Sequence, residues 1–243
     1  MALLMLAIEV SGTQDRAVPL VILGMVSLGL GVWALREGLW HWVMALALVL
    51  PVFFTLGVGF FYFLLPSNWL TRIPVVILYG VGIYALLLTA NIYTVSSLRT
   101  IALLRAAQAV GFVLTLITLF FVYDSVLSYR LFPWFGAVVV AAVSFPLFLS
   151  AVWTVDVGER VSRRMLLFAL LLSFLVGQVA LVLGFWPVSV AVGSLFLTTL
   201  GYIFLGISQH ELSGRLFAQN LWEYLAVGAA VFMTMFLTTR WGG

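Results

Sequence analysis

Three residue types are absent or scarce in this sequence, and each absence excludes some chemistry. The 243 residues include no cysteine, no lysine and only two histidines. Without cysteine, the chain can form no disulfide, thiolate nucleophile, iron–sulfur cluster or cysteine-ligated zinc site. Without lysine, it cannot carry out a reaction that needs a lysine amine, such as Schiff-base formation with retinal.

Charge is also scarce. Charged residues make up 8% of the chain and hydrophobic residues make up 65%, whereas a soluble domain carries roughly 25% charged residues. The exterior is therefore expected to face lipid. The apolar runs are continuous, about 18 residues or more in length, and this predicts membrane-spanning helices and not a barrel of alternating strands. The net charge of +3 is interpreted as a topology signal, so no nucleic-acid partner is expected.

These apolar runs predict an all-α transmembrane bundle of about eight spans with short loops. It is expected to form one integral membrane domain over residues 1–243, with residues 1–16 as a short interfacial leader. Residues 165–208 carry no charge, and one helix of that length would be about twice as long as the hydrocarbon core is thick. A hairpin at Pro187 is therefore expected. The spans are predicted near residues 17–35, 41–65, 73–95, 106–128, 133–155, 165–185, 188–208 and 216–239.

The arginines predict the orientation of the chain. Seven of the eleven lie in the connections after the first, third, fifth and seventh spans, and four lie on the other side. By the positive-inside rule, both termini are expected outside, in a bacterial or archaeal cytoplasmic membrane. The most charged connection would then be inside. There, Arg160, Arg163 and Arg164 are expected to contact anionic lipid headgroups.

A few polar residues fall within or at the ends of the spans and are the candidate functional residues. Glu223 lies in the last span, and Asn220 precedes it by one turn on the same helical face. If these faces converge with those of Asn91, Gln178 and His210, the five residues would line a polar ligand or ion pathway in the inner leaflet. The alternative is interhelical hydrogen bonding that holds the bundle together, worth about 0.6 kcal/mol each. The sequence favours this alternative.

Three further residues bear on chemistry. Asp124, near the outer end of the fourth span, is interpreted as an interfacial acid paired with Arg130 or hydrated at the headgroups. His41 and His210 could ligate a b-type haem from two helices. Both are expected at the ends of spans, however, and not inside the bundle. No cofactor, metal site or catalytic residue is therefore predicted.

The function that this pattern favours is non-enzymatic: a scaffold, or a subunit of a larger membrane assembly. Its expected partners are the lipid bilayer and other membrane subunits or further copies of the chain. No P-loop, nucleophile elbow, dinucleotide fingerprint or HExxH motif is present. Two alternatives stay open. One is a small-solute or ion transporter or channel with a polar cavity around Glu223, and the other is a lipid-modifying membrane enzyme.

Overall fold

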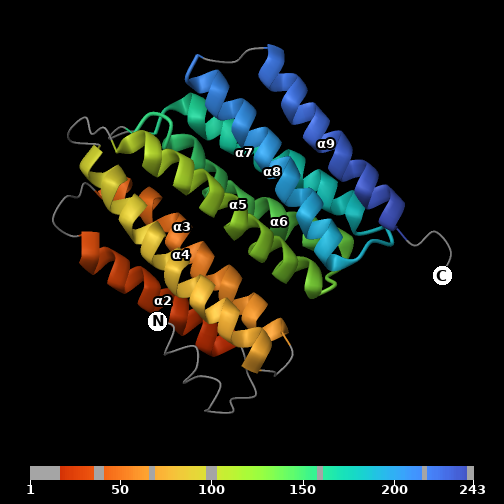
Figure 1. Ribbon diagram of the computed structural model, residues 1–243, viewed down its shortest axis with the longest axis horizontal. Helices are drawn as coiled ribbons and strands as arrows, with labels where there is room; N and C mark the ends of the chain where they lie inside the picture. Colours follow the sequence, from red (N-terminus) through yellow and green to blue (C-terminus); the bar gives the residue numbers. More distant parts are fainter. Residues whose placement is uncertain are drawn as a thin grey trace. The chain divides into compact units, whose positions relative to one another are not determined.

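The computed structural model describes residues 17–35, 41–65, 69–96, 103–157, 161–214 and 218–239. These residues form eight helices and no strand (Figure 1), which confirms the all-α bundle of about eight spans. The helices are α2 (Ala17–Leu35), α3 (His41–Leu64), α4 (Trp69–Ser96), α5 (Leu104–Ser128), α6 (Pro133–Trp153), α7 (Arg163–Leu183), α8 (Val190–Leu212) and α9 (Ala218–Thr238).

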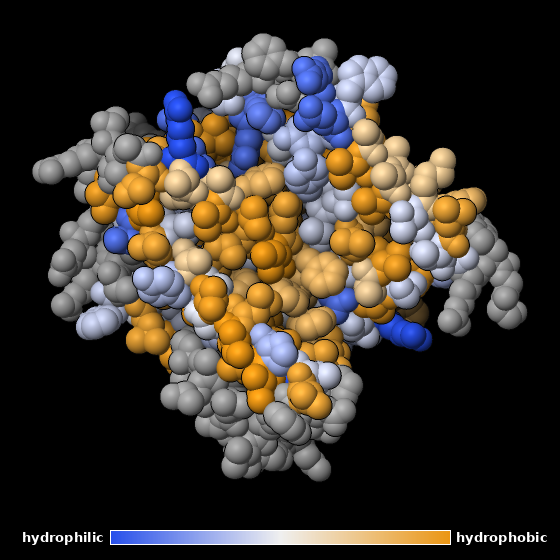
Figure 2. Space-filling model, in the orientation of Figure 1, coloured by the Kyte–Doolittle hydropathy of each residue, from blue (hydrophilic) through white to orange (hydrophobic). Residues whose placement is uncertain are grey.

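The helices from α3 to α9 each contain a stretch long and apolar enough to cross a membrane. In α2, the apolar stretch Gly24–Trp33 is shorter than these spans. Large hydrophobic side chains are exposed along most of the helices, and Figure 2 shows them over much of the face in view. A water-facing surface would not be built this way. The chain is therefore an integral, multi-pass membrane protein.

The chain divides into two compact units. Unit 1 comprises Met1–Val122 with Val157–Arg160, and unit 2 comprises Tyr123–Asp156 with Val161–Gly243. The boundary falls within α5, so one helix contributes to both units. Each unit is described below by itself, and the expectation of a single membrane domain stays a prediction.

The interior of unit 1 contains a cluster of three hydroxyls from three helices. Thr55 of α3 donates its hydroxyl to the carbonyl oxygen of Pro51 at 2.8 Å. A hydroxyl has one proton but two lone pairs. The hydroxyls of Ser27 in α2 and Tyr79 in α4, at 3.1 and 3.2 Å from Thr55 Oγ1, therefore donate to it. All three side chains are buried, and the cluster ties three helices together.

A second tyrosine of unit 1 reaches a backbone carbonyl of a neighbouring helix. The hydroxyl of Tyr93 in α4 donates to the carbonyl oxygen of Ala107 in α5 at 2.8 Å. Gly111 lies one turn further along α5, and a Cβ atom there would overlap the Tyr93 hydroxyl. A glycine at this position therefore leaves the space through which the phenol reaches the carbonyl.

Unit 2 is built around the close pair α6 and α7. A Cβ atom on Gly177 would lie 2.8 Å from Ala141 Cβ and 3.1 Å from the carbonyl oxygen of Ala137, so small residues allow the two backbones to approach. The predicted hairpin between α7 and α8 is confirmed. The chain turns after Leu183, and the Ser189 hydroxyl caps α8 by accepting from the Val192 N–H at 3.4 Å.

Most serine and threonine hydroxyls in these helices donate to a carbonyl three or four residues earlier in the same helix. Such bonds satisfy a polar group inside lipid without a partner helix. The residues with these bonds include Thr55, Thr89, Thr115, Thr118, Ser144, Ser173, Thr199 and Thr239.

Candidate functional site

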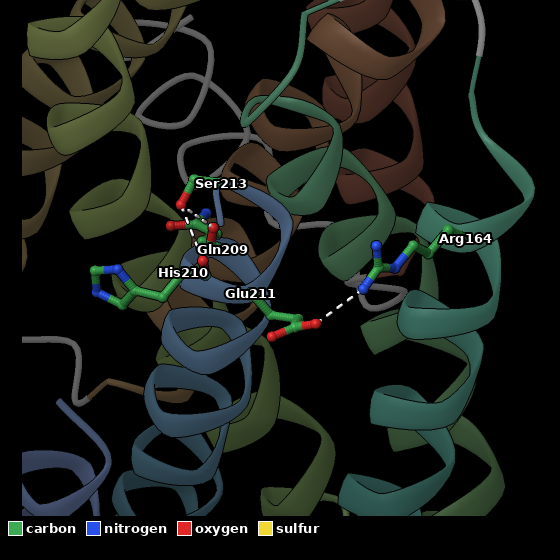
Figure 3. Close-up of polar contacts among 5 residues, drawn as sticks. All are labelled: Arg164, Gln209, His210, Glu211 and Ser213. Atoms are coloured by element: carbon green, nitrogen blue, oxygen red, sulfur yellow. Dashed lines mark hydrogen bonds and ion pairs between the residues drawn. The ribbon is translucent and has the colours of Figure 1, made fainter. Parts of the chain in front are cut away.

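The polar side chains of unit 2 gather where α7 begins and α8 ends. Ser162 caps α7, because its hydroxyl oxygen accepts from the Met165 N–H at 3.2 Å. Two residues later, Arg164 Nη2 donates to Glu211 Oε1 at 2.9 Å (Figure 3). The two side chains are 62% and 41% exposed, and an ion pair this exposed contributes about 0–1 kcal/mol. It helps to fix the start of α7 beside the last turn of α8.

The last turn of α8 is also tied to α6. Gln209 Nε2 donates to the carbonyl oxygen of Ala151 at 3.1 Å. The Thr154 hydroxyl donates to the same carbonyl oxygen at 2.7 Å. Carbonyls in the last turn of a helix lack an intrahelical N–H partner, so Gln209 and Thr154 satisfy the end of α6. The Ser213 hydroxyl then closes α8 by donating to the Gln209 carbonyl oxygen at 2.8 Å.

His210 lies on the other side of α8 from Glu211 (Figure 3). Its ring centroid is 6.1 Å from that of Tyr224 in α9, and the Tyr202 ring is 5.2 Å from Tyr224. A Cβ atom on Gly206 would overlap the Tyr224 phenol. His210 and Tyr202 thus flank a notch, made by Gly206, into which α9 inserts Tyr224.

The two histidines belong to different units. Among the described residues, no group of three or more histidine, aspartate or glutamate side chains could hold a metal ion. His210 belongs to unit 2 and contacts Tyr224. His41 belongs to unit 1, and its side chain lies outside the described residues. The two histidines are therefore not brought together by any described contact.

The remaining predicted pathway residues lie on outward faces of their helices. Glu223 in α9 and Gln178 in α7 are exposed in unit 2, and Asn91 in α4 is exposed in unit 1. None of the three side chains makes a hydrogen bond or ion pair with another described residue. The side chain of Asn220 lies outside the described residues. A shared polar pathway around Glu223 stays a prediction.

The headgroup contact also stays a prediction. Arg163 and Arg164 are exposed at the start of α7, where an arginine can reach phosphate groups. The guanidinium of Arg164 also forms the ion pair with Glu211. Arg160 lies outside the described residues.

Asp124 is buried near the end of α5, and its partner is not the expected one. The Ser194 hydroxyl of α8 lies 3.2 Å from Asp124 Oδ1, and its one proton is shared between this oxygen and the carbonyl oxygens of Val190 and Ala191, at 2.9 and 3.1 Å. No ion pair forms between Asp124 and Arg130 within the described part of the chain. The helix α5 ends at Ser128. Arg130 lies past the end of this helix and is exposed.

Helices joined by hydroxyl bonds and small-residue contacts, with apolar outward faces, define a polytopic helical membrane protein. The chain belongs to the family described as "Protein of unknown function (DUF5656)", whose model matches residues 7–238. No curated protein and no solved structure matches the chain.

Proposed function

We propose that this protein is a non-enzymatic subunit of a membrane assembly, and that it binds a second copy of itself through α4. The observation that carries the proposal is the exposed asparagine, Asn91, on an apolar face of that helix. A polar side chain that faces lipid costs free energy unless it finds a partner.

The outward face of α4 has the spacing of a helix-pairing surface. Six of the exposed residues of α4 follow one another at alternating intervals of four and three, which is the period of a left-handed helix pair. They are Ile77, Val81, Tyr84, Leu88, Asn91 and Val95. We call these six residues the α4 stripe. Its hydrophobic members are between 41% and 70% exposed, so the stripe is free to pack against another helix.

A second copy of the chain is the occupant that fits the stripe best. Copies inserted in the same orientation carry α4 at the same depth. Around a two-fold axis along the membrane normal, Asn91 would meet its own counterpart. An amide both donates and accepts, so two Asn91 side chains can satisfy one another. A hydrogen bond of this kind contributes about 0.6 kcal/mol on average in a membrane protein, and 1–2 kcal/mol in model peptides.

The other exposed polar residues support further lateral contacts. Gln178 lies among exposed apolar residues of α7 that include Phe174 and Val182, and Glu223 lies beside the exposed Trp222 in α9. A solute pathway would need Gln178 and Glu223 to face the interior of unit 2. Their outward position favours contacts with other membrane subunits over a transport function.

The absence of cysteine allows a direct test of the stripe. Single cysteines at Val81 or Leu88 are the reporters, and Leu78→Cys is the control. Leu78 is exposed in the same helix. It is rotated about the helix axis by about 100° from Ile77, which points in the mean direction of the stripe. After oxidation in native membranes, the two stripe variants should give a disulfide-linked dimer and Leu78→Cys should give much less. Equal crosslinking at all three positions, or none at the stripe, would contradict the proposal.

We further infer that the protein resides in a bacterial or archaeal cytoplasmic membrane with both termini outside. Two observations support this orientation. If all eight helices of the described residues cross the membrane, α9 ends on the side where α2 begins. The arginines at the start of α7, Arg163 and Arg164, favour the inner face.

A further inference from the structure

Unit 2 contains a cavity of about 690 Å³ that is separate from the polar cluster at the start of α7. It lies where α5 and α7 end and where α6 and α8 begin, so it is at the opposite end of the helices from the Arg164–Glu211 pair. Its volume is within the range of about 300–1,000 Å³ that is typical of small-molecule sites. The residues around it include Leu127, Arg130, Gly136, Leu183, Trp186 and Ser189.

The walls of the cavity are fixed by local contacts. A Cβ atom on Gly184 would lie 2.7 Å from Pro133 Cβ, so a glycine lets the end of α7 approach the start of α6. Trp186 Nε1 donates to the Thr239 hydroxyl at the end of α9, at 3.1 Å. The Ser189 hydroxyl is engaged as the cap of α8. Among the residues that line the cavity, Arg130 is the charged one.

Arg130 occupies a backbone position that favours glycine. Its φ angle is +45°, and its N–H donates to the Leu127 carbonyl oxygen at 3.1 Å, where the chain leaves α5. Left-handed positions after a helix are usually glycine, because a side chain there is strained. The backbone conformation at residue 130 therefore does not explain why this residue is an arginine. A strained residue that lines a cavity is a candidate for a binding role.

The cavity is lined by one charged side chain, Arg130, and by several apolar side chains. Arg130 is exposed and pairs with no carboxylate in the described ranges, so its planar group of donors is free to bind a phosphate. Asp124, the nearest acid along α5, is engaged by Ser194 and does not line the cavity. Apolar side chains such as Leu127, Leu183 and Val190 form other parts of the wall. They suit a hydrocarbon chain.

We propose that this cavity binds an anionic phospholipid, with its headgroup phosphate on Arg130 and the upper part of a chain against Leu127, Leu183 and Val190. The cavity lies at the ends of membrane-spanning helices, which is the depth at which lipid phosphates meet the hydrocarbon. The proposal does not depend on α4 or on self-association.

Two variants separate the charge from the volume of the cavity. Arg130→Gly removes the guanidinium and also relieves the backbone strain, so the folded protein should not lose thermal stability in lipid-free detergent. Gly136→Leu keeps the arginine and fills the space, because a Cβ atom at Gly136 has its nearest neighbour 3.9 Å away, at Leu131. Arg105→Gln, at an exposed arginine of unit 1, is the control for non-specific attraction of anionic lipid.

The measurement is native mass spectrometry of the purified protein with phosphatidylglycerol, with phosphatidylcholine and with inorganic phosphate. Wild type and Arg105→Gln should retain phosphatidylglycerol in preference to phosphatidylcholine. Arg130→Gly should weaken that retention by about tenfold or more, and Gly136→Leu should weaken it as well. Equal retention by wild type and Arg130→Gly, or no preference between the two lipids, would overturn the proposal. Arg130-dependent binding of phosphate without retention of lipid would overturn the assignment to a phospholipid.

Discussion

The Tyr123 hydroxyl of α5 and the Ser144 hydroxyl of α6 lie 2.7 Å apart, and Ser144 donates its own proton to the Val140 carbonyl oxygen at 2.6 Å. Tyr123 must therefore be the donor to Ser144. Unit 1 repeats this arrangement, with Tyr79 donating to Thr55 and Thr55 donating to the Pro51 carbonyl oxygen. In both units a tyrosine supplies the bond between helices, and the smaller hydroxyl satisfies its own helix.

Tyr123→Phe should lower the free energy of unfolding by about 1 kcal/mol, because it removes one buried hydrogen bond and leaves Ser144 bonded to its own helix. Equilibrium unfolding of the purified protein in a denaturing detergent would measure the change. Tyr84→Phe is the control, since Tyr84 is 70% exposed, and it should change the stability of the monomer little. If both variants lose the same stability, the buried bond is not what holds α5 against α6.

Gly206→Ala should destabilise the protein by about 1–3 kcal/mol, because the new methyl group overlaps the Tyr224 phenol and pushes α9 away from α8. A thermal melt would show the loss as a lower Tm. Gly80→Ala is a matched control. A Cβ atom at Gly80 meets nothing within 4 Å, and alanine favours a helix, so this variant should be neutral or slightly more stable. A lower Tm for Gly80→Ala alone would contradict the assigned packing.

Asn91→Leu should weaken self-association roughly three- to thirtyfold, which corresponds to the loss of one interhelical amide bond in lipid. The readout is the yield of the Leu88→Cys disulfide dimer at several protein-to-lipid ratios. Asn91→Gln keeps an amide group, so this variant should associate more strongly than Asn91→Leu and less strongly than wild type. A dimer that becomes stronger with leucine would show that apolar packing of the α4 stripe dominates and that the amide opposes it.

Reporter fusions should find the C-terminus outside. A periplasmic reporter fused after Gly243 should be active and a cytoplasmic reporter inactive, because the arginine bias favours an inner location for the loop before α7. A fusion between Val157 and Val161 should give the reverse pattern. Cytoplasmic activity at Gly243 would mean that one helix does not cross the membrane or that the orientation is inverted.

The span limits could be predicted from the sequence because hydropathy reports where lipid begins and ends. One difference of four residues is at α8, which ends at Leu212 and not near residue 208. Gln209, His210 and Glu211 are polar, so hydropathy ends the span before them. The helix nevertheless continues through them, because Gln209 bonds to α6 and Glu211 bonds to Arg164.

The rotation of each helix about its axis could not be predicted from the sequence, because it depends on contacts with other helices. Glu223 faces outward, while the next residue, Tyr224, enters the notch at Gly206. That contact depends on a residue in another helix. The partner of Asp124 was missed for the same reason, since Ser194 lies 70 residues away in the sequence. A serine one turn into α8 carries no local signal that it faces a carboxylate.

The hydroxyl bonds within single helices have a consequence for how the protein is made. Thr115, Thr118 and Ser173 each return their proton to a carbonyl of their own helix. Such a helix can leave the translocon and enter the bilayer before its neighbours exist, without an unsatisfied hydroxyl. The phenols of Tyr79, Tyr93 and Tyr123 each form a hydrogen bond to a group of another helix. We expect insertion to proceed helix by helix and these three tyrosines to form their bonds afterwards, when the helices pack together.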